Sequence, residues 1–352
     1  MIIAALLLCT LGTVVLYSSS PNQAILQAIF CLIGLGLYWL ISNFDYRAIK
    51  PFRWILYSVV IVLLLIVAIT NFETRGSVRW IPLGLFNLQP SELAKPVLIV
   101  VLGFFWATRQ PTVLNILKSL AILGPIFFLI FRQPDLGTAL TVGFIWFGML
   151  LAANVSFWKV AIMGVMAALM APVSWLLMHD YQRNRITSFL FPTNDPLGKG
   201  FHVIQSTIAV GSGQLFGRGL GRGTQSRLQF LPEFRTDFIF AFIAEELGFI
   251  GSLIVLTLYG VLFWFCYRVL AGAEDRLGEL LVAGVMSMLF FQTVVNIGMN
   301  IGIMPVTGIT LPLLSYGGSS LIAIFISLGF IQSVKRFGSR RKSIETFSLT
   351  EI

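Results

Sequence analysis

The segment that decides the fold reads FGRGLGRGTQSRLQFLPEFRTDFIFAFIAEELGFI and covers residues 216–250. It begins as a loop rich in Gly and Arg and continues as an apolar helix. Thr236 is a favoured N-cap residue, which would place Asp237 in the first helical turn, where the helix dipole favours a negative charge. Further along, Glu245 and Glu246 are surrounded by apolar residues. A cationic loop that brings a carboxylate to the water-facing end of an apolar helix predicts a reaction site at a membrane surface.

The composition around this segment is that of a membrane protein. Of 352 residues, 57% are hydrophobic and only 11% are charged, and the mean hydropathy is +0.88. A soluble domain would carry about 25% charged residues. The net charge of +9 does not indicate nucleic-acid binding, because the basic residues lie between apolar runs. The three cysteines fall within such runs and show neither a disulfide nor a metal-site spacing.

Apolar runs long enough to cross a bilayer recur along the whole chain. They predict an all-α polytopic membrane protein that forms a single integral membrane domain over residues 1–352. The first run lacks a basic flank, so we expect a true first helix rather than a signal peptide. The ten predicted spans cover residues 2–18, 24–42, 53–70, 92–107, 114–131, 137–153, 157–178, 237–268, 279–302 and 315–334.

The distribution of Lys and Arg predicts the orientation of these spans. With both termini in the cytoplasm, thirteen basic residues lie on the cytoplasmic side and three in the short outer loops. Positive charge is retained on the cytoplasmic side of membrane proteins. Residues 179–236 then form a long extracytoplasmic loop, and residues 335–352 form a cytoplasmic tail. Within that loop, residues 200–213 have the spacing of a short amphipathic helix in the interface plane.

Two charged residues at the start of the fourth span do not belong in lipid. Glu92 and Lys95 are three residues apart and can pair on one helix face. Charged residues inside spans commonly mark function, and an ion pair that joins helices is the alternative. Just before them, Arg79 and Trp80 form a pattern typical of an interfacial anchor.

Other polar residues occur at the ends of spans. Asp135 opens the sixth span, either as a helix cap with Arg132 as its local partner or as a residue with a chemical role. Asn296 and Asn300 form a polar stripe on the ninth span, which predicts hydrogen bonds between helices. The lone histidines of the long loop, including His202, carry no predicted catalytic role.

The glycine–arginine run at residues 217–223 superficially resembles a phosphate-binding loop. No strand precedes it, which excludes a dinucleotide fold. Flexible backbone with Arg218, Arg222 and Arg227 nearby suits a pyrophosphate at a lipid surface. The alternative is a solvated loop that is attracted to anionic headgroups.

Helical geometry limits the partners of Asp237. In a straight helix, Glu245 would lie about 80° around the axis and roughly 12 Å deeper, and Glu246 would lie on the opposite face. Asp237 should therefore act alone or with a partner from another span, either Asp135 or the Glu–Lys pair of the fourth span. The two glutamates are then expected to join helices or to shape a polar cavity.

The last motif, MPVTGITLPLLSYGGSS at residues 304–320, contains Pro305, Gly308 and Pro312, which exclude a regular helix. It predicts a re-entrant or tightly packed outer connection. Such backbone at membrane depth needs protein or water partners for its polar groups. We expect it to form one wall of a cavity beside Asp237.

Together these motifs resemble the SEDS (shape, elongation, division and sporulation) proteins, which are bacterial peptidoglycan glycosyltransferases. The resemblance covers almost the whole chain. Residues 202–206 and 223–226 look more like the elongation branch than the division branch. Arg235 and Leu85 depart from the usual His and Pro. The motifs are YSSS at 17–20, RWI at 79–81, QPSE at 89–92, QPDLGT at 133–138, LPE at 231–233, TDFIFA at 236–241, Pro312, and SYGGSS at 315–320.

The resemblance implies a reaction in the bacterial cytoplasmic (inner) membrane, with the active site on the extracytoplasmic side. Lipid II or an undecaprenyl-linked glycan would donate its MurNAc C1 to the GlcNAc 4-hydroxyl of another lipid II, with inversion. Asp237 would act as general base. Candidates for contact with substrate, from the motifs and the resemblance, are Glu92, Lys95, Asp135, Arg79, Trp80, Lys199, Gln205, Ser206, Arg218, Arg222, Arg235 and Ser315.

No cofactor is evident, although a divalent cation is a candidate to share the pyrophosphate charge. The expected partner is a class B penicillin-binding protein that cross-links the product. Two other classes of function stay open. A transporter that flips lipid II would use carboxylates near the membrane midplane. A non-catalytic scaffold for a transpeptidase would not need Asp237.

Overall fold

The computed structural model describes residues 1–70, 79–82, 87–178, 180–192, 200–223 and 235–338. Helices dominate it, and its strands are β1 (Ile81–Pro82) and β2 (Asn87–Leu88), which pair antiparallel. The helices are α1 (Ile2–Ser19), α2 (Pro21–Asn43), η1 (Tyr46–Phe52), α3 (Arg53–Thr70), α4 (Pro90–Ala107), α5 (Val113–Arg132), α6 (Leu136–Ala152), α7 (Phe157–Leu177), α8 (Asp180–Leu190), α9 (Phe201–Ser212), α11 (Ile239–Ala271), α12 (Arg276–Asn300) and α13 (Gly318–Phe337).

The predicted spans are confirmed. Eight described helices are long and apolar enough to cross a membrane, and the apolar helices over Leu136–Ala152 and Phe157–Met170 are shorter. All ten predicted runs correspond to helices whose ends agree to within three residues. The protein is therefore an all-α polytopic membrane protein.

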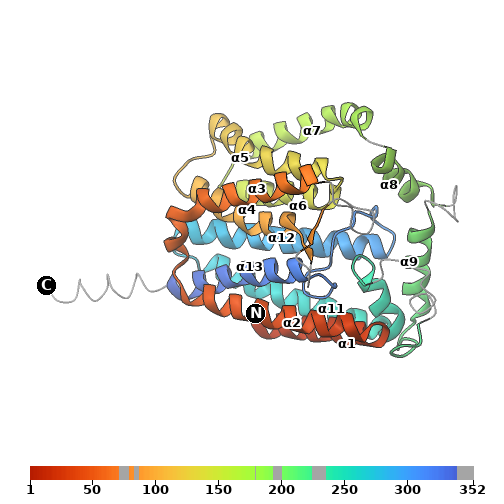
Figure 1. The fold of residues 1–352 in the computed structure, drawn as a ribbon. Helices are drawn as coiled ribbons and strands as arrows, with labels where there is room; N and C mark the ends of the chain where they lie inside the picture. Colours follow the sequence, from red (N-terminus) through yellow and green to blue (C-terminus); the bar gives the residue numbers. More distant parts are fainter. Residues whose placement is uncertain (71–78, 83–86, 179, 193–199, 224–234, 339–352) are drawn as a thin grey trace.

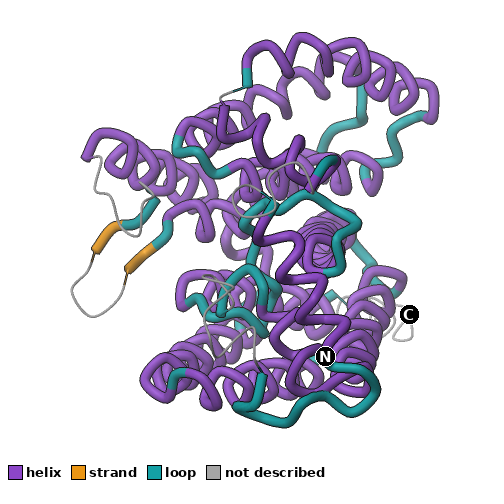
Figure 2. Tube along the Cα trace, turned by 90° about the vertical axis from the view of Figure 1, so that its right-hand side faces the viewer, coloured by secondary structure: helices purple, strands orange, loops and turns teal. Residues whose placement is uncertain are grey.

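The spans lie side by side as one bundle, with α8 and α9 at one end (Figure 1). We call this end the α9 end and the other, where α13 ends at Phe337, the opposite end. The predicted short helix over residues 200–213 is confirmed. Figure 1 shows α9 running across the bundle end rather than along the spans, the direction that a helix in the interface plane would take. Figure 2 looks onto the α9 end and shows the β1–β2 hairpin at the edge of the molecule.

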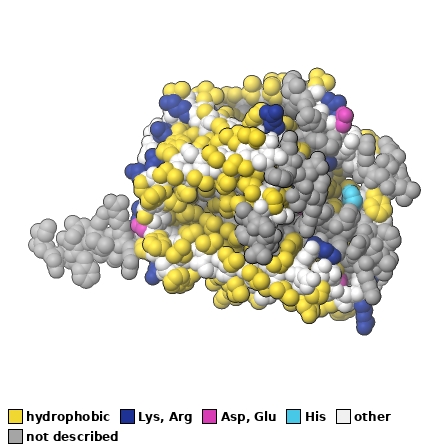
Figure 3. Space-filling view, in the orientation of Figure 1, with side chains coloured by type: hydrophobic (Ala, Val, Ile, Leu, Met, Phe, Trp, Pro, Cys, Tyr) yellow, Lys and Arg dark blue, Asp and Glu magenta, His cyan; other side chains and the backbone are white. Residues whose placement is uncertain are grey.

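The centre of the bundle is formed by α4, α12 and α13. In the most apolar windows of these helices, 78%, 67% and 72% of the residues are buried, against 17% for the segment Tyr46–Thr70 that contains α3. Hydrophobic side chains cover much of the flank that Figure 3 shows. An apolar outer surface of this extent on long helices is what contact with lipid requires.

The predicted straight helix over residues 237–268 is wrong in one respect. Gly248 has φ 68° and ψ −160°, so α11 is two helical pieces joined at a break. The loop preceding α11 in the chain packs onto this break: Phe249 N donates to Gln214 O (2.8 Å) and Ile250 N to Leu215 O (3.2 Å). A side chain at position 248 would meet Gly217 N at 2.3 Å, so glycine permits this close approach.

Candidate active site

Asp237 lies in a turn just before α11, at the α9 end, and is partly exposed. Its backbone carbonyl accepts hydrogen bonds from two side chains of α12, Asn296 Nδ2 at 2.9 Å and Asn300 Nδ2 at 3.0 Å. Both asparagines are fully buried. The predicted inter-helix hydrogen bonding of this stripe is confirmed, and it fixes the backbone that carries the carboxylate.

The predicted cap at Thr236 is wrong, since α11 begins at Ile239 with Phe238 as its N-cap. Phe238 has no side-chain acceptor, and Asn300 Oδ1 instead accepts from Ala241 N at 3.0 Å. A first-turn amide needs an acceptor when buried, and α12 provides it. The carbonyl of Thr236 is also engaged by a distant residue, because Ser315 Oγ donates to it at 2.5 Å. Asp237 therefore precedes the helix rather than lying in its first turn.

The α12–α13 connection, residues 301–317, is the irregular and closely packed segment that the sequence predicts. Four of its carbonyl groups accept hydrogen bonds from side chains of four helices, the kind of partner that backbone at membrane depth requires. Gln27 Nε2 donates to Leu314 O at 3.1 Å, and Asn296 Nδ2 donates to Ile309 O at 2.7 Å. The Tyr259 hydroxyl and the Arg185 guanidinium bond Pro312 O and Thr307 O.

This connection lies against Asp237 at Gly308. A Cβ atom at Gly308 would be 3.6 Å from Asp237 Oδ2 and 3.8 Å from Arg185 Nη1. Arg185 Nη1 also donates to Thr307 O at 2.8 Å. The carboxylate and the guanidinium therefore converge on one glycine, whose φ of 76° suits a residue without a side chain.

Arg185 is the site residue that sequence reasoning missed. It belongs to α8, within the long loop, where no motif or spacing singles it out. Arg235 is held through its backbone, since Tyr316 N donates to Arg235 O at 2.9 Å. Ser315 is 4% exposed, and its hydroxyl accepts from Leu311 N at 2.8 Å. The structure thus brings Asp237, Arg235 and Ser315 together with Arg185.

Asp135 is buried, and it caps α6 by accepting from Thr138 N at 3.1 Å. Its charged partner is Arg79 at 3.7 Å rather than the expected Arg132, and Gln89 Nε2 donates to it at 3.3 Å. Arg79 can reach it because its guanidinium also bonds the carbonyl groups of the turn before α6. A chemical role for Asp135 would require its hydrogen bonds and its ion pair with Arg79 to break or rearrange.

The α12–α13 connection also borders this group. A Cβ atom at Gly137, two residues after Asp135, would meet Thr307 O at 2.7 Å. The segment of residues 307–309 thus contacts both Gly137 and Asp237. This segment therefore lies between the polar residues around Asp135 and those around Asp237.

Glu92 and Lys95 form an ion pair of 2.7 Å near the start of α4. Lys95 is 1% exposed and Glu92 5% exposed. Because both partners are buried, removal of either one would leave an unpaired buried charge, which makes the pair costly to break. The pair faces the bundle interior, which fits both a functional role and an ion pair that joins helices, the two alternatives that the sequence leaves open.

Glu246 joins the glycine–arginine loop to α1. Its carboxylate accepts from Ser18 Oγ at 3.0 Å and from Gly221 N at 2.6 Å. Glu246 therefore connects the first piece of α11 to this loop and to the end of α1. Because α11 breaks at Gly248, this first piece stays beside the loop and the end of α1. The predicted role of Glu246 in joining helices is confirmed.

The remaining candidates lie around this end. Arg218 and Arg222 are exposed on the loop, and Trp80 is partly exposed beside β1. Ser206 of α9 is fully buried and donates to Asn300 O at 2.6 Å. Lys199 and Arg227 lie outside the described residues, as does Leu85.

Two further residues of α9 are partly exposed, Gln205 and His202. Burial lowers the pKa of His202, so its imidazole is neutral at pH 7. The described residues contain no group of three or more His, Cys, Asp or Glu side chains that could hold a metal ion.

Comparison with known proteins decides the family. The profile of the FtsW/RodA/SpoVE cell cycle proteins matches residues 1–340. The chain belongs to this family. It is the SEDS family that the motifs indicate, so that resemblance is confirmed. Stage V sporulation protein E of Bacillus subtilis is 38% identical over 354 residues, covering 96% of each chain. Peptidoglycan glycosyltransferase MrdB of Escherichia coli is 38% identical over 341 residues, covering 95% of this chain and 92% of the relative.

Solved structures agree with the fold. A structure described as the structural coordination of polymerization and crosslinking by a peptidoglycan synthase complex matches with a TM-score of 0.84 and 34% identity, covering 96% of this chain and 97% of that chain. The rod shape determining protein RodA of Thermus thermophilus matches with a TM-score of 0.72 and 30% identity, covering 96% of each chain. The SEDS architecture therefore extends over nearly the whole chain.

Proposed function

We propose that this chain is a peptidoglycan glycosyltransferase that polymerises lipid II, with Asp237 as general base. Family membership and the relatives named as peptidoglycan glycosyltransferases support the reaction class. The observation that carries the assignment of Asp237 is its setting. It is a partly exposed carboxylate at the α9 end, on a backbone clamped by Asn296 and Asn300, with the Arg185 guanidinium converging on the same glycine.

In the proposed reaction, the GlcNAc 4-hydroxyl of one lipid II attacks the MurNAc C1 of a lipid-linked donor. The new C1–O bond forms as the bond from C1 to the pyrophosphate oxygen breaks, and undecaprenyl pyrophosphate leaves. Asp237 takes the hydroxyl proton. Direct displacement inverts C1 and needs one base and no covalent intermediate, by analogy with inverting glycosidases.

The leaving pyrophosphate needs positive charge as it departs. Arg185 is a candidate for this role, since its Nη1 atom and Asp237 Oδ2 both lie within 4 Å of the Gly308 Cβ position. Arg218 and Arg222 on the neighbouring loop are further candidates. A divalent cation would share this charge, and the substrate phosphates would supply most of its ligands, so that Asp237 stays free to act as the base.

Backbone clamping explains why Asp237 can act alone. A base must be held within hydrogen-bond reach of the proton it takes. Ser315, Asn296 and Asn300 hold the carbonyl groups of residues 236 and 237. We assign Ser315 to positioning of this turn, and Ser206 to positioning of α9 against α12.

The proposal places the α9 end outside the cytoplasm, in the inner membrane of a bacterium, with both termini in the cytoplasm. The excess of Lys and Arg in the short connections at the opposite end supports this orientation. A class B penicillin-binding protein is the proposed partner. The structural similarity to a chain of a peptidoglycan synthase complex that couples polymerization and crosslinking supports this partner. A role in elongation rests on the motifs at residues 202–206 and 223–226.

A liposome assay separates polymerase from transporter and scaffold. Lipid II is placed in the outer leaflet only, with a label on its peptide, and the purified chain is reconstituted alone. The proposal predicts lysozyme-sensitive glycan on the side of the α9 end. Labelled lipid II that crosses the bilayer without glycan would favour a flippase. Neither glycan nor crossing, with the partner transpeptidase also present, would favour a scaffold.

A further inference from the structure

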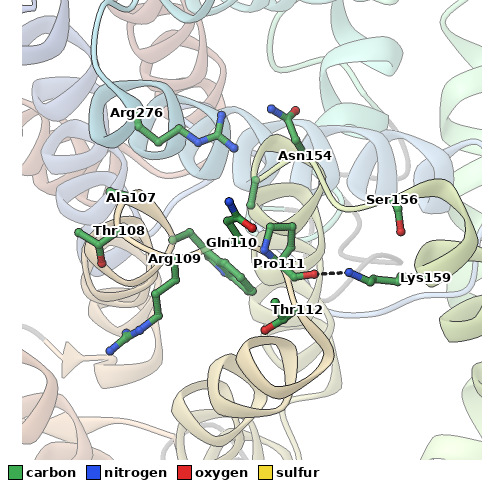
Figure 4. A pocket seen from close by; sticks show the side chains of 12 residues that line it. Ala107, Thr108, Arg109, Gln110, Pro111, Thr112, Asn154, Ser156, Lys159 and Arg276 are labelled. Atoms are coloured by element: carbon green, nitrogen blue, oxygen red, sulfur yellow. Dashed lines mark hydrogen bonds between the residues drawn. The ribbon is translucent and has the colours of Figure 1, made fainter.

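The opposite end of the bundle contains a cavity that the proposed reaction does not use. Its volume is about 640 Å³, and it lies between the α4–α5 and α6–α7 connections and the start of α12. Figure 4 shows Arg276 and Lys159 extending from opposite sides toward Gln110 and Pro111, whereas Arg109 turns away from them. The cavity is far from Asp237, since α4 and α12 each run from one site to the other.

The lining is cationic. Arg109, Lys159 and Arg276 line the cavity, and none of its described lining residues is acidic. Two of these cations are already engaged, Lys159 Nζ with Pro111 O at 2.6 Å and Arg276 Nη1 with Glu279 at 2.6 Å. Each retains further N–H donors, because an ammonium has three and a guanidinium five. The first turns of α5, α7 and α12 also lie here, and helix N-termini attract anions.

A buried donor points to a missing acceptor. Trp106 is 1% exposed and lines the cavity, and its Nε1 has no hydrogen-bond partner among the described residues. An indole N–H can only donate, and a buried unsatisfied donor is costly. The Nε1 atom itself is enclosed, so a ligand oxygen that supplies the missing acceptor would have to draw the indole edge toward the cavity.

The rim of the cavity is apolar and outward-facing. Val113 and Leu114 at the start of α5 are 63% and 60% exposed, and Phe157 and Trp158 at the start of α7 are 77% and 75% exposed. Aromatic residues at span ends are typical of the membrane interface. A ligand with a charged head and an apolar body would fit both the cavity and the rim.

We propose that this cavity binds the phosphodiester headgroup of an anionic phospholipid, with Lys159, Arg276 and the Trp106 N–H as donors. Basic pockets between spans are typical sites for anionic lipid headgroups. A soluble phosphate has the same negative charge but no apolar part that could contact the rim. The proposal is independent of the reaction at Asp237.

The test is lipid retention by the full-length protein in nanodiscs that contain dioleoyl phosphatidylglycerol and dioleoyl phosphatidylcholine, read by native mass spectrometry. The wild type should retain phosphatidylglycerol selectively. Lys159→Gln and Arg276→Gln should each weaken this retention about fivefold, as expected for one charge at a membrane surface. Trp106→Phe keeps a ring but removes the donor, and should weaken it about tenfold.

Lys118→Gln is the matched control, because Lys118 is an exposed cation of α5 that does not line the cavity. An equal loss in this control would overturn the site and leave only general surface charge. Melting temperatures in nanodiscs of phosphatidylcholine alone show whether each variant is folded. Stabilisation by millimolar inorganic phosphate, without preference for phosphatidylglycerol, would overturn the lipid assignment in favour of a soluble anion. No preference for either ligand would overturn the proposal entirely.

Discussion

Asn300 shows how one residue sets the active-site turn. Its Nδ2 donates to Asp237 O, and its Oδ1 accepts from Ala241 N, so a single amide holds the turn and caps the helix that follows. Asn296 adds a second donor to the same carbonyl. Asp237 is therefore oriented by buried groups of α12 rather than by its own helix.

We predict that the single substitution Gly308→Ala lowers the rate of catalysis more than it lowers the stability of the fold. The residue has φ 76°, and its new methyl group would lie 3.6 Å from Asp237 Oδ2 and 3.8 Å from Arg185 Nη1. The backbone strain should cost about 1 kcal/mol. The methyl group would make only ordinary van der Waals contacts with both groups, so we expect relief of the backbone strain to shift the connection against Asp237 and to lower the rate of glycan formation about 10²-fold. Rates from purified lipid II and melting curves measure the two effects.

Gly211→Ala is the control, since Gly211 lies in α9 at the same end and its Cβ position has no atom within 4 Å. Its rate should match the wild type. A Gly308→Ala protein that polymerises at the wild-type rate would contradict the placement of the base beside this glycine.

Sequence reasoning reached Asp237 because its motif is local, TDFIFA at a helix start. It missed Arg185 because a lone Arg in a long loop has no spacing that indicates its neighbour. The link between the two runs through Gly308, which is far from both in sequence, so only the folded chain reveals it. The cap of α11 was mispredicted for the same reason, since Asn300 replaces the local acceptor that Thr236 would have provided.

The break in α11 is the decisive feature among the elements. Because the helix breaks at Gly248, the loop of residues 214–222 forms hydrogen bonds with the exposed backbone on both sides of it. Gly219 N donates to Glu246 O at 3.0 Å, and Phe249 N donates to Gln214 O at 2.8 Å. The glycine–arginine loop is thereby fixed at the α9 end, where the proposal requires its cations.

We predict that Gly248→Ala destabilises the protein by about 2–3 kcal/mol, because φ 68° with ψ −160° is a conformation that only glycine adopts readily. The added Cβ would also meet Leu215 O at 2.7 Å. Thermal melts should show the loss, and hydrogen exchange should rise over residues 214–222. Gly260→Ala, on the same helix with no atom within 4 Å, should melt at or above the wild-type temperature. Equal melting of both variants would contradict the break.

The spans themselves were predictable, since each is an apolar run of bilayer length. The break was not, because Gly248 lies inside such a run, and glycine is common in transmembrane helices. Its backbone conformation depends on the close approach of Gly217, a contact between two segments that no periodicity encodes.

For the whole molecule, the bundle separates two polar ends by an apolar flank. The α9 end holds Asp237, and the opposite end holds the cationic cavity. The buried α4, α12 and α13 connect them, and α4 carries the Glu92–Lys95 pair. Charge counts predicted this polarity, but the cavity arises from three connections that meet only in the fold.

The predicted orientation can be tested by cysteine labelling in intact bacterial cells. Leu220→Cys places a thiol on the loop at the α9 end, and Thr108→Cys places one at the opposite end; both positions are exposed. A membrane-impermeant maleimide should label the first in whole cells and the second only after permeabilisation, because positive charge is retained inside. The reverse pattern would place Asp237 in the cytoplasm and contradict the proposed site.

The most direct measurement is glycan formation from purified lipid II by Asp237→Asn, compared with Asp180→Asn, which alters an exposed acidic residue at the start of α8. We predict that Asp237→Asn keeps the wild-type melting temperature and binds lipid II, but polymerises at least about 10²-fold more slowly, as loss of a general base requires. Asp180→Asn should polymerise normally. An Asp237→Asn protein that produces glycan at the wild-type rate would contradict the assignment of Asp237 as the base.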